Sequence, residues 1–225
     1  MANDQEKEAA AQASLRFVKD GQIVGLGTGS TAAHFIQLLG EKVKKGLKIR
    51  GIPTSERSRQ LAQSLGIPLT TLDECQRIDV TVDGADEVDA KLRLIKGGGG
   101  ALLREKIVAS VTKQLVIVVD ASKRVKMLGK FPLPVEVIKF AEAPVAKKIK
   151  ALGADVQLRM GDHGKPYLTD ENNYILDCRF GEIRGPVALA RELSDMPGVV
   201  EHGLFIGMAS KVLVANGGKI IELKR

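Results

Sequence analysis

The chain has 225 residues, of which 44% are hydrophobic and 27% charged, and its formal net charge is +7. This composition is typical of a globular protein and excludes a disordered chain, and the length suffices to bury a sizeable core. Aromatic residues make up 4% and tryptophan is absent, so we expect no surface that stacks nucleic acid, and the positive charge suits a small anionic substrate.

The first two-thirds of the chain alternate between short apolar runs and helical patterns. We expect a helix capped by Asn3 or Asp4 that runs to about Val18, and another that opens near Ser30. The other predicted elements are strands at 23–26, 48–52, 78–82 and 115–119 and helices at 56–65 and 101–110. This alternation predicts a Rossmann-like, doubly wound, mostly parallel sheet, with the wholly apolar run at 115–119 covered on both faces.

A second pattern follows, in which Pro132 and Pro134 indicate a linker. The predicted elements after it are strands at 135–140, 154–159, 174–180 and 199–202 and helices at 145–152 and 186–193. Their βαββαβ order predicts a smaller, ferredoxin-like α+β domain. We therefore expect a Rossmann-like catalytic domain at 1–130 plus 203–225, whose last short strands return to the first sheet, and a small domain at 131–202.

A glycine-rich turn, Gly25-Leu26-Gly27-Thr28-Gly29-Ser30-Thr31, stands between a predicted strand and a predicted helix. Its backbone amides, the helix start and the hydroxyls form a pattern that cradles a phosphate. The turn matches neither the dinucleotide fingerprint nor the P-loop, because the third glycine comes too early and no Gly-Lys-Ser/Thr follows. The alternative is a tight turn that a serine caps.

An acidic cluster at 82–89 also follows a strand, and Asp83 and Asp86 are placed to face the crevice of the glycine turn. Spacing leaves three interpretations open. The carboxylates transfer protons or bind hydroxyls of a sugar, hold Mg²⁺, or form a solvated Asx-type turn.

Three further features lie at or near this predicted sheet edge. Lys96 precedes four glycines whose backbone is able to press against a substrate, although a flexible linker is the alternative. Glu105, in the following helix, is a candidate general base or else a solvated glutamate. Lys123, after the strand at 115–119, is able to reach an anionic group, or else it is a surface lysine.

Cysteine usage, histidine placement and hydropathy exclude other classes. Cys75 and Cys178 stand far apart, so we expect reduced thiols in a cytoplasmic protein rather than a disulfide framework or a zinc site. The three histidines are scattered and support no metal site or catalytic triad. No apolar run approaches membrane-spanning length and the first residues are polar, so we expect no secretory signal and no membrane association. Because the basic residues are spread along the chain and aromatic residues are few, we expect no nucleic-acid partner either.

Taken together, the motifs closely resemble the A-type ribose-5-phosphate isomerase family over nearly the whole chain. The segments that carry the resemblance are, in order, GLGTGSTAAHFI, TSERSRQLA, DVTVDGADEVD, LIKGGGGALLREKIVA, VVDASKRV, LPVEVI and PGVVEHGLF. The resemblance implies cofactor-free and metal-free interconversion of D-ribose 5-phosphate and D-ribulose 5-phosphate in the pentose phosphate pathway. It also implies a homodimer.

The resemblance also assigns site residues. It implies that Glu105 is the proton acceptor and that Asp83, Asp86 and Lys96 take part in catalysis. The residues that it implies bind substrate are Thr28, Gly29, Ser30, Thr31, Asp83, Gly84, Ala85, Asp86, Lys96, Gly97, Gly98, Gly99, Lys123 and Lys7.

Two other classes of function are weighed against this one. One is a different enzyme on a related sheet, such as an amino-sugar-phosphate deaminase or a CoA transferase, and the continuous run of motifs argues against it. The other is a non-catalytic sensor of sugar phosphates behind a DNA-binding module. The sequence offers no added helix-turn-helix segment for that role.

Overall fold

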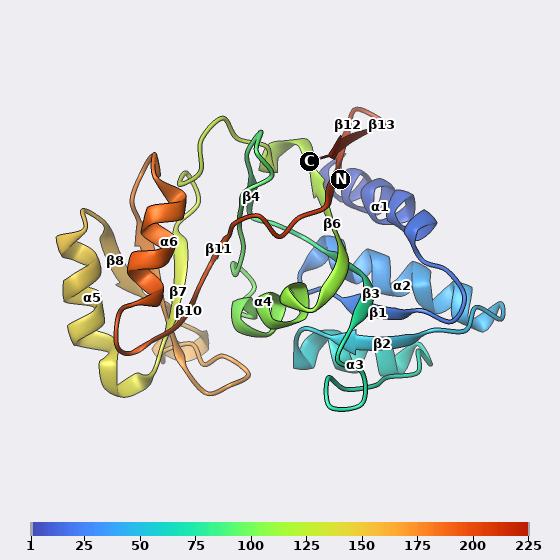
Figure 1. Cartoon of the computed structure of the whole chain (residues 1–225), viewed down its shortest axis with the longest axis horizontal. Coiled ribbons are helices and arrows are strands. Elements are labelled where there is room, and N and C mark those ends of the chain that lie inside the picture. Colours follow the sequence, from blue (N-terminus) through green and yellow to red (C-terminus); the bar gives the residue numbers. More distant parts are fainter. Residues whose placement is uncertain (1, 225) are drawn as a thin grey trace. The chain divides into compact units, whose positions relative to one another are not determined.

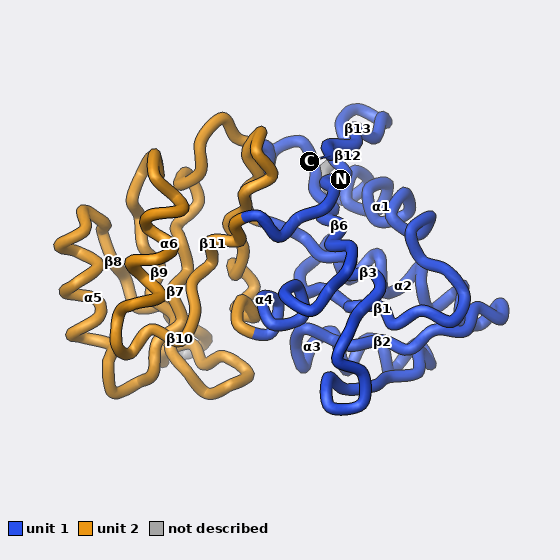
Figure 2. The backbone as a smooth tube through the Cα atoms, viewed as in Figure 1, with its two compact units in different colours: residues 1–85, 104–124, 207–225 blue, residues 86–103, 125–206 orange. Residues whose placement is uncertain are grey.

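The computed structural model describes residues 2–224, which form two compact units. Of the described residues, unit 1 comprises 2–85, 104–124 and 207–224, and unit 2 comprises 86–103 and 125–206 (Figure 2). The chain therefore passes from one unit to the other at 85/86, 103/104, 124/125 and 206/207.

Unit 1 is built on a six-stranded sheet in the order β13-β12-β6-β3-β1-β2 (Figure 1). Neighbouring strands are parallel, except that β12 and β13 are antiparallel. The strands are β1 (Ile23–Leu26), β2 (Arg50–Pro53), β3 (Ile78–Asp83), β6 (Thr112–Asp120), β12 (Lys211–Asn216) and β13 (Lys219–Lys224). The fold-class prediction of a mostly parallel α/β sheet is confirmed.

Helices pack on this sheet because its strands are apolar on both faces. In β6, Val116 and Val118 belong to the main core, and the residues that alternate with them are buried as well. The helices are α1 (Ala2–Ser14), α2 (Ser30–Lys44), α3 (Glu56–Ser64) and α4 (Leu102–Ser110), with the 3₁₀ turns η1 (Leu15–Phe17) and η2 (Ala121–Lys123). Side chains of α1, α2 and α3 fill the main core, and Val108 of α4 packs in a second cluster with Ile52 and Ile78.

The strand order of unit 1 reverses at β1, next to the edge strand β2. Strand β1 pairs with β2 on one side and with β3 on the other, so the chain crosses over β1 between them. In open α/β sheets, ligands bind outside the carboxyl ends of the strands at such a reversal. The glycine turn follows β1 and the acidic cluster begins at the end of β3, so both stand at this point.

Unit 2 contains the predicted βαββαβ order, with four antiparallel strands arranged β10-β7-β9-β8. Its elements are β7 (Leu133–Val137), η3 (Lys139–Ala141), α5 (Glu142–Ala151), β8 (Asp155–Leu158), η4 (Asp162–Gly164), β9 (Tyr174–Arg179), α6 (Pro186–Ser194) and β10 (Val199–His202). This is the ferredoxin-like arrangement, and that part of the fold prediction is confirmed as well.

A small antiparallel sheet in unit 2 was not anticipated from the sequence. Its strands are β4 (Glu87–Val88), β5 (Leu94–Ile95) and β11 (Leu204–Phe205), in the order β11-β5-β4. This pairing places 86–103 in unit 2, where 125–130 also lies, whereas the predicted boundaries put both in the first domain. The domain boundaries drawn from the sequence stay a prediction.

Several local predictions are wrong. The strand predicted at 135–140 ends at Val137, and residues 139–141 form η3. Helix α1 already begins at Ala2, so Asp4 lies inside its first turn and contacts His34 instead of capping the helix. Strand β2 begins at Arg50 rather than at residue 48. Pro134 lies in β7, not in a linker, and its carbonyl accepts a hydrogen bond from the Gly203 amide at 2.8 Å. Proline lacks only the donor, so its carbonyl still takes part in pairing.

Within residues 2–224, no helix is both long enough and apolar enough to cross a membrane.

Candidate functional site

The glycine turn joins the end of β1 to the start of α2. The Gly27 amide donates to the Val82 carbonyl of β3 at 3.0 Å, so the turn stays paired with β3 beyond the end of β1. Gly29 precedes α2 as its N-cap, with φ of 105°. The first amides of a helix have no partner within it and carry a partial positive charge, so the start of this 15-residue helix is able to bind an anion.

Close packing against Asp83 requires glycine at position 27. A Cβ atom there would lie 2.3 Å from Asp83 Oδ1 and 2.6 Å from Asp83 Cα. The second contact is with backbone, which cannot rotate away. The glycine therefore permits the turn to touch the carboxylate.

The Asp83 side chain is buried at the carboxyl end of β3, with 1% of its surface exposed. Its Oδ1 accepts hydrogen bonds from the amides of Thr28 at 3.0 Å and Gly84 at 2.8 Å. These two bonds fix the orientation of the carboxylate against the glycine turn.

The hydroxyl-bearing residues of the turn differ in how deeply they are buried. Thr28 is buried, and its Oγ1 lies 2.8 Å from both Thr54 Oγ1 and Ser55 Oγ at the start of α3. The Thr28 side chain is thus engaged inside the protein. Ser30, in contrast, is exposed at the start of α2, and Thr31 beside it is buried.

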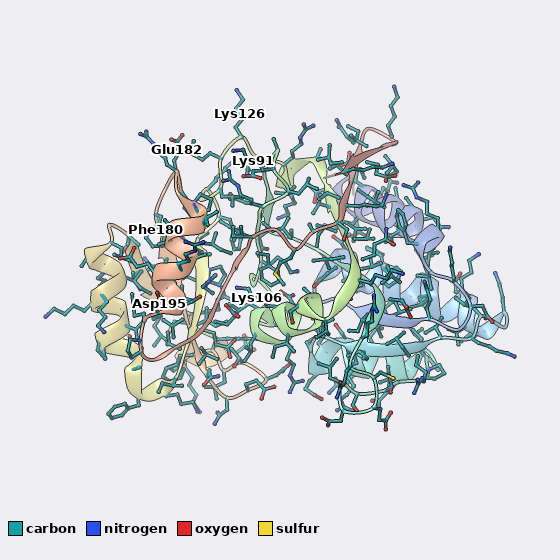
Figure 3. All side chains as sticks on the ribbon, in the orientation of Figure 1. Lys91, Lys106, Lys126, Phe180, Glu182 and Asp195 are labelled. Atoms are coloured by element: carbon teal, nitrogen blue, oxygen red, sulfur yellow. The ribbon has the colours of Figure 1, made fainter. Side chains whose placement is uncertain are left out.

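Glu105 lies in the first turn of α4, and only 4% of its surface is exposed. Its neighbour Lys106 is labelled in Figure 3. Arg104 on the other side donates to Glu56 of α3 at 3.1 Å, and Glu56 also accepts from Arg59 at 2.7 Å. The Arg59 and Arg104 guanidinium groups lower the pKa of Glu56. This charged group ties α4 to α3 next to Glu105.

Two predicted lysines lie elsewhere in unit 1. Lys123 is the last residue of η2, which Asp120 caps by accepting the amide of Ser122 at 2.9 Å. Lys7 lies in the middle of α1. Both side chains are partly exposed and are able to meet a ligand from solvent.

In unit 2 the structure brings Asp86 and the glycine run together. The Asp86 amide donates to the Ile95 carbonyl at 2.8 Å, and its carboxylate accepts the amide of Gly98 at 2.8 Å. Lys96 is buried, its amide donates to the Gly203 carbonyl at 2.9 Å, and its ammonium group lies 5.4 Å from the centre of the Phe205 ring. Gly97 is buried, whereas Gly98 and Gly99 are exposed.

Sequence reasoning missed Arg159, at the end of β8. Its guanidinium donates to the carbonyls of Gly97 at 2.9 Å and Gly98 at 3.2 Å, and it is paired in turn with Asp177. In the loop that follows β8, the Tyr167 side chain packs against Gly100. A Cβ atom added at Gly100 would lie 2.2 Å from the Tyr167 hydroxyl oxygen. No local pattern marks these residues, because they meet the glycine run only through tertiary folding.

Sequence reasoning also assigned no role to Thr54, Ser55 and Ser58. A signal was present, since these hydroxyl residues directly follow β2 at the carboxyl edge of the sheet.

Within each unit, therefore, the predicted residues partly converge. Unit 1 joins the glycine turn to Asp83 and Gly84 and carries Lys7, Glu105 and Lys123 on α1, α4 and η2. Unit 2 joins Asp86 to the run that follows Lys96. In the described part of the chain, no three His, Cys, Asp or Glu side chains gather in a way that could hold a metal ion.

Comparison with known proteins gives one consistent family. Residues 50–219 match the family model of ribose 5-phosphate isomerase A, also called phosphoriboisomerase A. The ribose-5-phosphate isomerase A of Parvibaculum lavamentivorans is 54% identical over 99% of this chain and all of its own length. That of a Synechococcus species is 51% identical over 99% of this chain and 98% of its own.

Solved structures agree with the sequence comparison. A D-ribose-5-phosphate isomerase in complex with phospho-erythronic acid is 42% identical with a TM-score of 0.97, covering all of both chains. The ribose 5-phosphate isomerase A of Methanocaldococcus jannaschii is 43% identical with a TM-score of 0.94, covering 98% of this chain and 99% of its own. With the glycine turn, Asp83 and the glycine run in place, this chain belongs to the ribose-5-phosphate isomerase A family.

Proposed function

We propose that this protein interconverts D-ribose 5-phosphate and D-ribulose 5-phosphate in the non-oxidative branch of the pentose phosphate pathway. One observation carries the proposal beyond family membership. The Thr28 amide joins an anion-binding turn to the Asp83 carboxylate at the reversal point of the sheet. An isomerase of a sugar phosphate needs both an anchor for phosphate and groups that handle hydroxyl protons.

The reaction moves one proton between C2 and C1 after the sugar ring opens, through a cis-enediolate. A single carboxylate is able to take the proton from one carbon and return it to the other, and we assign that role to Glu105. Its burial supports the assignment, because a base shielded from water meets little competition from solvent protons.

The enediolate carries negative charge that needs donors. We assign this stabilisation to Lys96 and the amides of the glycine run, which are held by Asp86 and Arg159. A general base supplies roughly 10²–10⁴-fold acceleration, so electrostatic stabilisation must contribute a comparable share. Asp83, with Asp86, handles the hydroxyl protons during ring opening and enediolate formation.

The phosphate is assigned to the start of α2. Ser30 and Thr31 stand in its first turn, and Lys7 and Lys123 are assigned to add positive charge. In this proposal Thr28 and Gly29 shape the turn, and Gly84, Ala85, Gly97, Gly98 and Gly99 are assigned to substrate binding. No cofactor is assigned.

The decisive test is Glu105→Gln. We expect its turnover of ribose 5-phosphate, measured in a coupled assay, to fall by about 10²–10⁴-fold while its unfolding temperature stays near that of the parent. Glu41→Gln, an exposed glutamate of α2, is the matched control and should keep full activity. A Glu105→Gln variant with most of its activity would show that the base is misassigned.

A chelator in the same assay tests the metal-free mechanism. Activity should persist after dialysis against EDTA, and a loss that Mg²⁺ restores would contradict the proposal.

We also propose that the protein is a cytoplasmic homodimer whose Rossmann-like and ferredoxin-like domains follow the boundaries given by the sequence. Two free thiols, Cys75 and the buried Cys178, support a reducing compartment. Light scattering after size exclusion tests the dimer, and a mass of about one chain would overturn it.

A further inference from the structure

A cluster of four buried hydroxyl groups stands behind the glycine turn. We name Thr28, Thr54, Ser55 and Ser58 the hydroxyl cluster; their exposed fractions are 8%, 0%, 4% and 4%. The Thr28 hydroxyl donates to Ser55 Oγ at 2.8 Å, and Ser55 Oγ donates to Ser58 Oγ at 3.0 Å. Ser55 also caps α3 by accepting the Ser58 amide at 3.1 Å. The cluster therefore ties the turn to the start of α3.

The Leu26–Gly27 peptide group of the turn is hydrogen-bonded at both its carbonyl and its amide. The Leu26 carbonyl accepts from the Thr54 amide at 2.9 Å and from Thr54 Oγ1 at 3.0 Å. On the other side of the same peptide plane, the Gly27 amide donates to the Val82 carbonyl at 3.0 Å. This peptide plane cannot rotate without breaking bonds to β3 or to Thr54.

The next peptide group, Gly27–Thr28, is also hydrogen-bonded at both its carbonyl and its amide. The partner of its amide is the proposed catalytic carboxylate, Asp83. Ser58 Oγ donates to the Gly27 carbonyl at 2.6 Å, and the Thr28 amide donates to Asp83 Oδ1 at 3.0 Å. The Gly27–Thr28 peptide thus lies between Ser58 and Asp83. Rotation of this plane would move the donor that orients Asp83 and, with it, the path of the chain into α2.

We propose that Thr54 and Ser58 are positioning residues for catalysis, which fix two consecutive peptide planes and thereby set both the phosphate anchor at α2 and the orientation of Asp83. The proposal rests on the proposed function and adds residues to its machinery. Neither side chain touches the substrate in this scheme. Both act through the backbone of Leu26, Gly27 and Thr28.

The size of the effect follows from how enzymes depend on geometry. A buried carbonyl that loses its donor is left unsatisfied, and the peptide plane turns to find another partner. A displacement of about 1 Å in a positioning element costs on the order of 10²-fold in rate. We therefore expect kcat/KM for ribose 5-phosphate to fall by about 10- to 100-fold in Ser58→Ala and by about 10-fold in Thr54→Val, where the Thr54 amide still serves Leu26.

Matched variants separate positioning from stability. Ser64→Ala removes an exposed serine of the same helix whose hydroxyl also donates to a backbone carbonyl, that of Leu61 at 2.8 Å, and should leave kcat/KM within about twofold. Thr54→Val keeps the shape of the side chain and removes the hydroxyl, whereas Thr54→Ser keeps the hydroxyl. Thr54→Ser should therefore recover most of the activity that Thr54→Val loses.

A binding measurement supplies a readout besides turnover. The Kd of phospho-erythronic acid, determined by calorimetry, should rise in Ser58→Ala and Thr54→Val and stay unchanged in Ser64→Ala. Normal kcat/KM and normal Kd per folded molecule, with only a lower unfolding temperature, would overturn the proposal. If Ser58→Ala does not fold, the Thr54→Val and Thr54→Ser pair decides. A parent protein that binds the probe but does not isomerise ribose 5-phosphate would contradict the proposed function, and the Kd series would still test the positioning residues.

Discussion

Two glycine-rich segments, one in each unit, carry residues that we propose bind substrate, and they are held in different ways. The turn of unit 1 is fixed by β3, by the buried hydroxyl cluster and by Asp83, all through its own peptide groups. The run of unit 2 is held by two side chains, the Asp86 carboxylate and the Arg159 guanidinium, and by a backbone hydrogen bond within it, from the Gly100 amide to the Gly97 carbonyl at 3.0 Å. The first segment is therefore rigid, as an anchor for phosphate must be. The second is able to adjust more, because the groups that hold it from outside the run are side chains, whereas the turn is also bonded to the backbone of β3 and of Thr54.

The two units also differ in the groups that donate hydrogen bonds to their buried acids. Asp83 accepts two backbone amides on one oxygen. Glu136, in the middle of β7, accepts from the Thr169 hydroxyl at 2.8 Å and from the Asn173 side-chain nitrogen, Nδ2, at 3.0 Å. Burial raises the pKa of Glu136, although both hydrogen bonds oppose the shift. Unit 2 thus carries a buried acid whose pKa lies above its ordinary value.

The largest difference is expected between alanine substitutions at the two glycine segments. Gly27→Ala places its Cβ against the Asp83 backbone, and we expect activity to fall by more than about 100-fold with stability reduced by roughly 1–3 kcal/mol. In Gly98→Ala the new Cβ would lie 2.6 Å from Asp86 Oδ1, which is able to rotate away, so a loss of about tenfold or less is expected. Activity assays and thermal unfolding measure both effects. Equal damage in the two variants would break the comparison between a rigid and an adjustable segment.

Arg159→Gln tests what holds the adjustable segment. Losing the guanidinium removes a donor from the Gly97 and Gly98 carbonyls, of which Gly97 still accepts from the Gly100 amide. We expect kcat to fall by about tenfold because the amides of the run are less well aligned. Arg179→Gln, an exposed arginine of β9, is the control and should behave as the parent does. Unchanged steady-state kinetics in Arg159→Gln would show that the run keeps its shape without side-chain support.

The smallest effect concerns Glu136 and appears in stability rather than activity. Because the pKa of Glu136 is raised in the folded state, its contribution to stability is full below the pKa of the unfolded chain and is lost as pH rises through the folded pKa. Glu136→Gln mimics the neutral acid, so its free energy of unfolding should fall less between pH 4 and pH 8. Urea denaturation across this pH range measures the free energy of unfolding, and substitution of the exposed Glu182, Glu182→Gln, is the control. Parallel pH profiles for Glu136→Gln and the parent would contradict the assignment.

Much of the fold and part of the site followed from the sequence alone. Alternation of apolar runs with helical patterns predicted the parallel sheet, and the strand-helix order predicted the ferredoxin-like unit, because periodicity records which faces are buried. The motifs located the glycine turn, the acids at Asp83 and Asp86, and Glu105. These features depend on residues that are close along the chain.

Only the tertiary structure decided how those residues are held. It buried the Thr28 hydroxyl in a cluster with Thr54 and Ser58, and it brought Arg159 next to the glycine run. It also paired β5 with β11, and nothing in the sequence of these two short strands indicates that pairing. The physical reason is common to all three. Each of these contacts joins segments far apart in the chain, and a local pattern of hydropathy or spacing shows which faces are buried but not which distant segments meet.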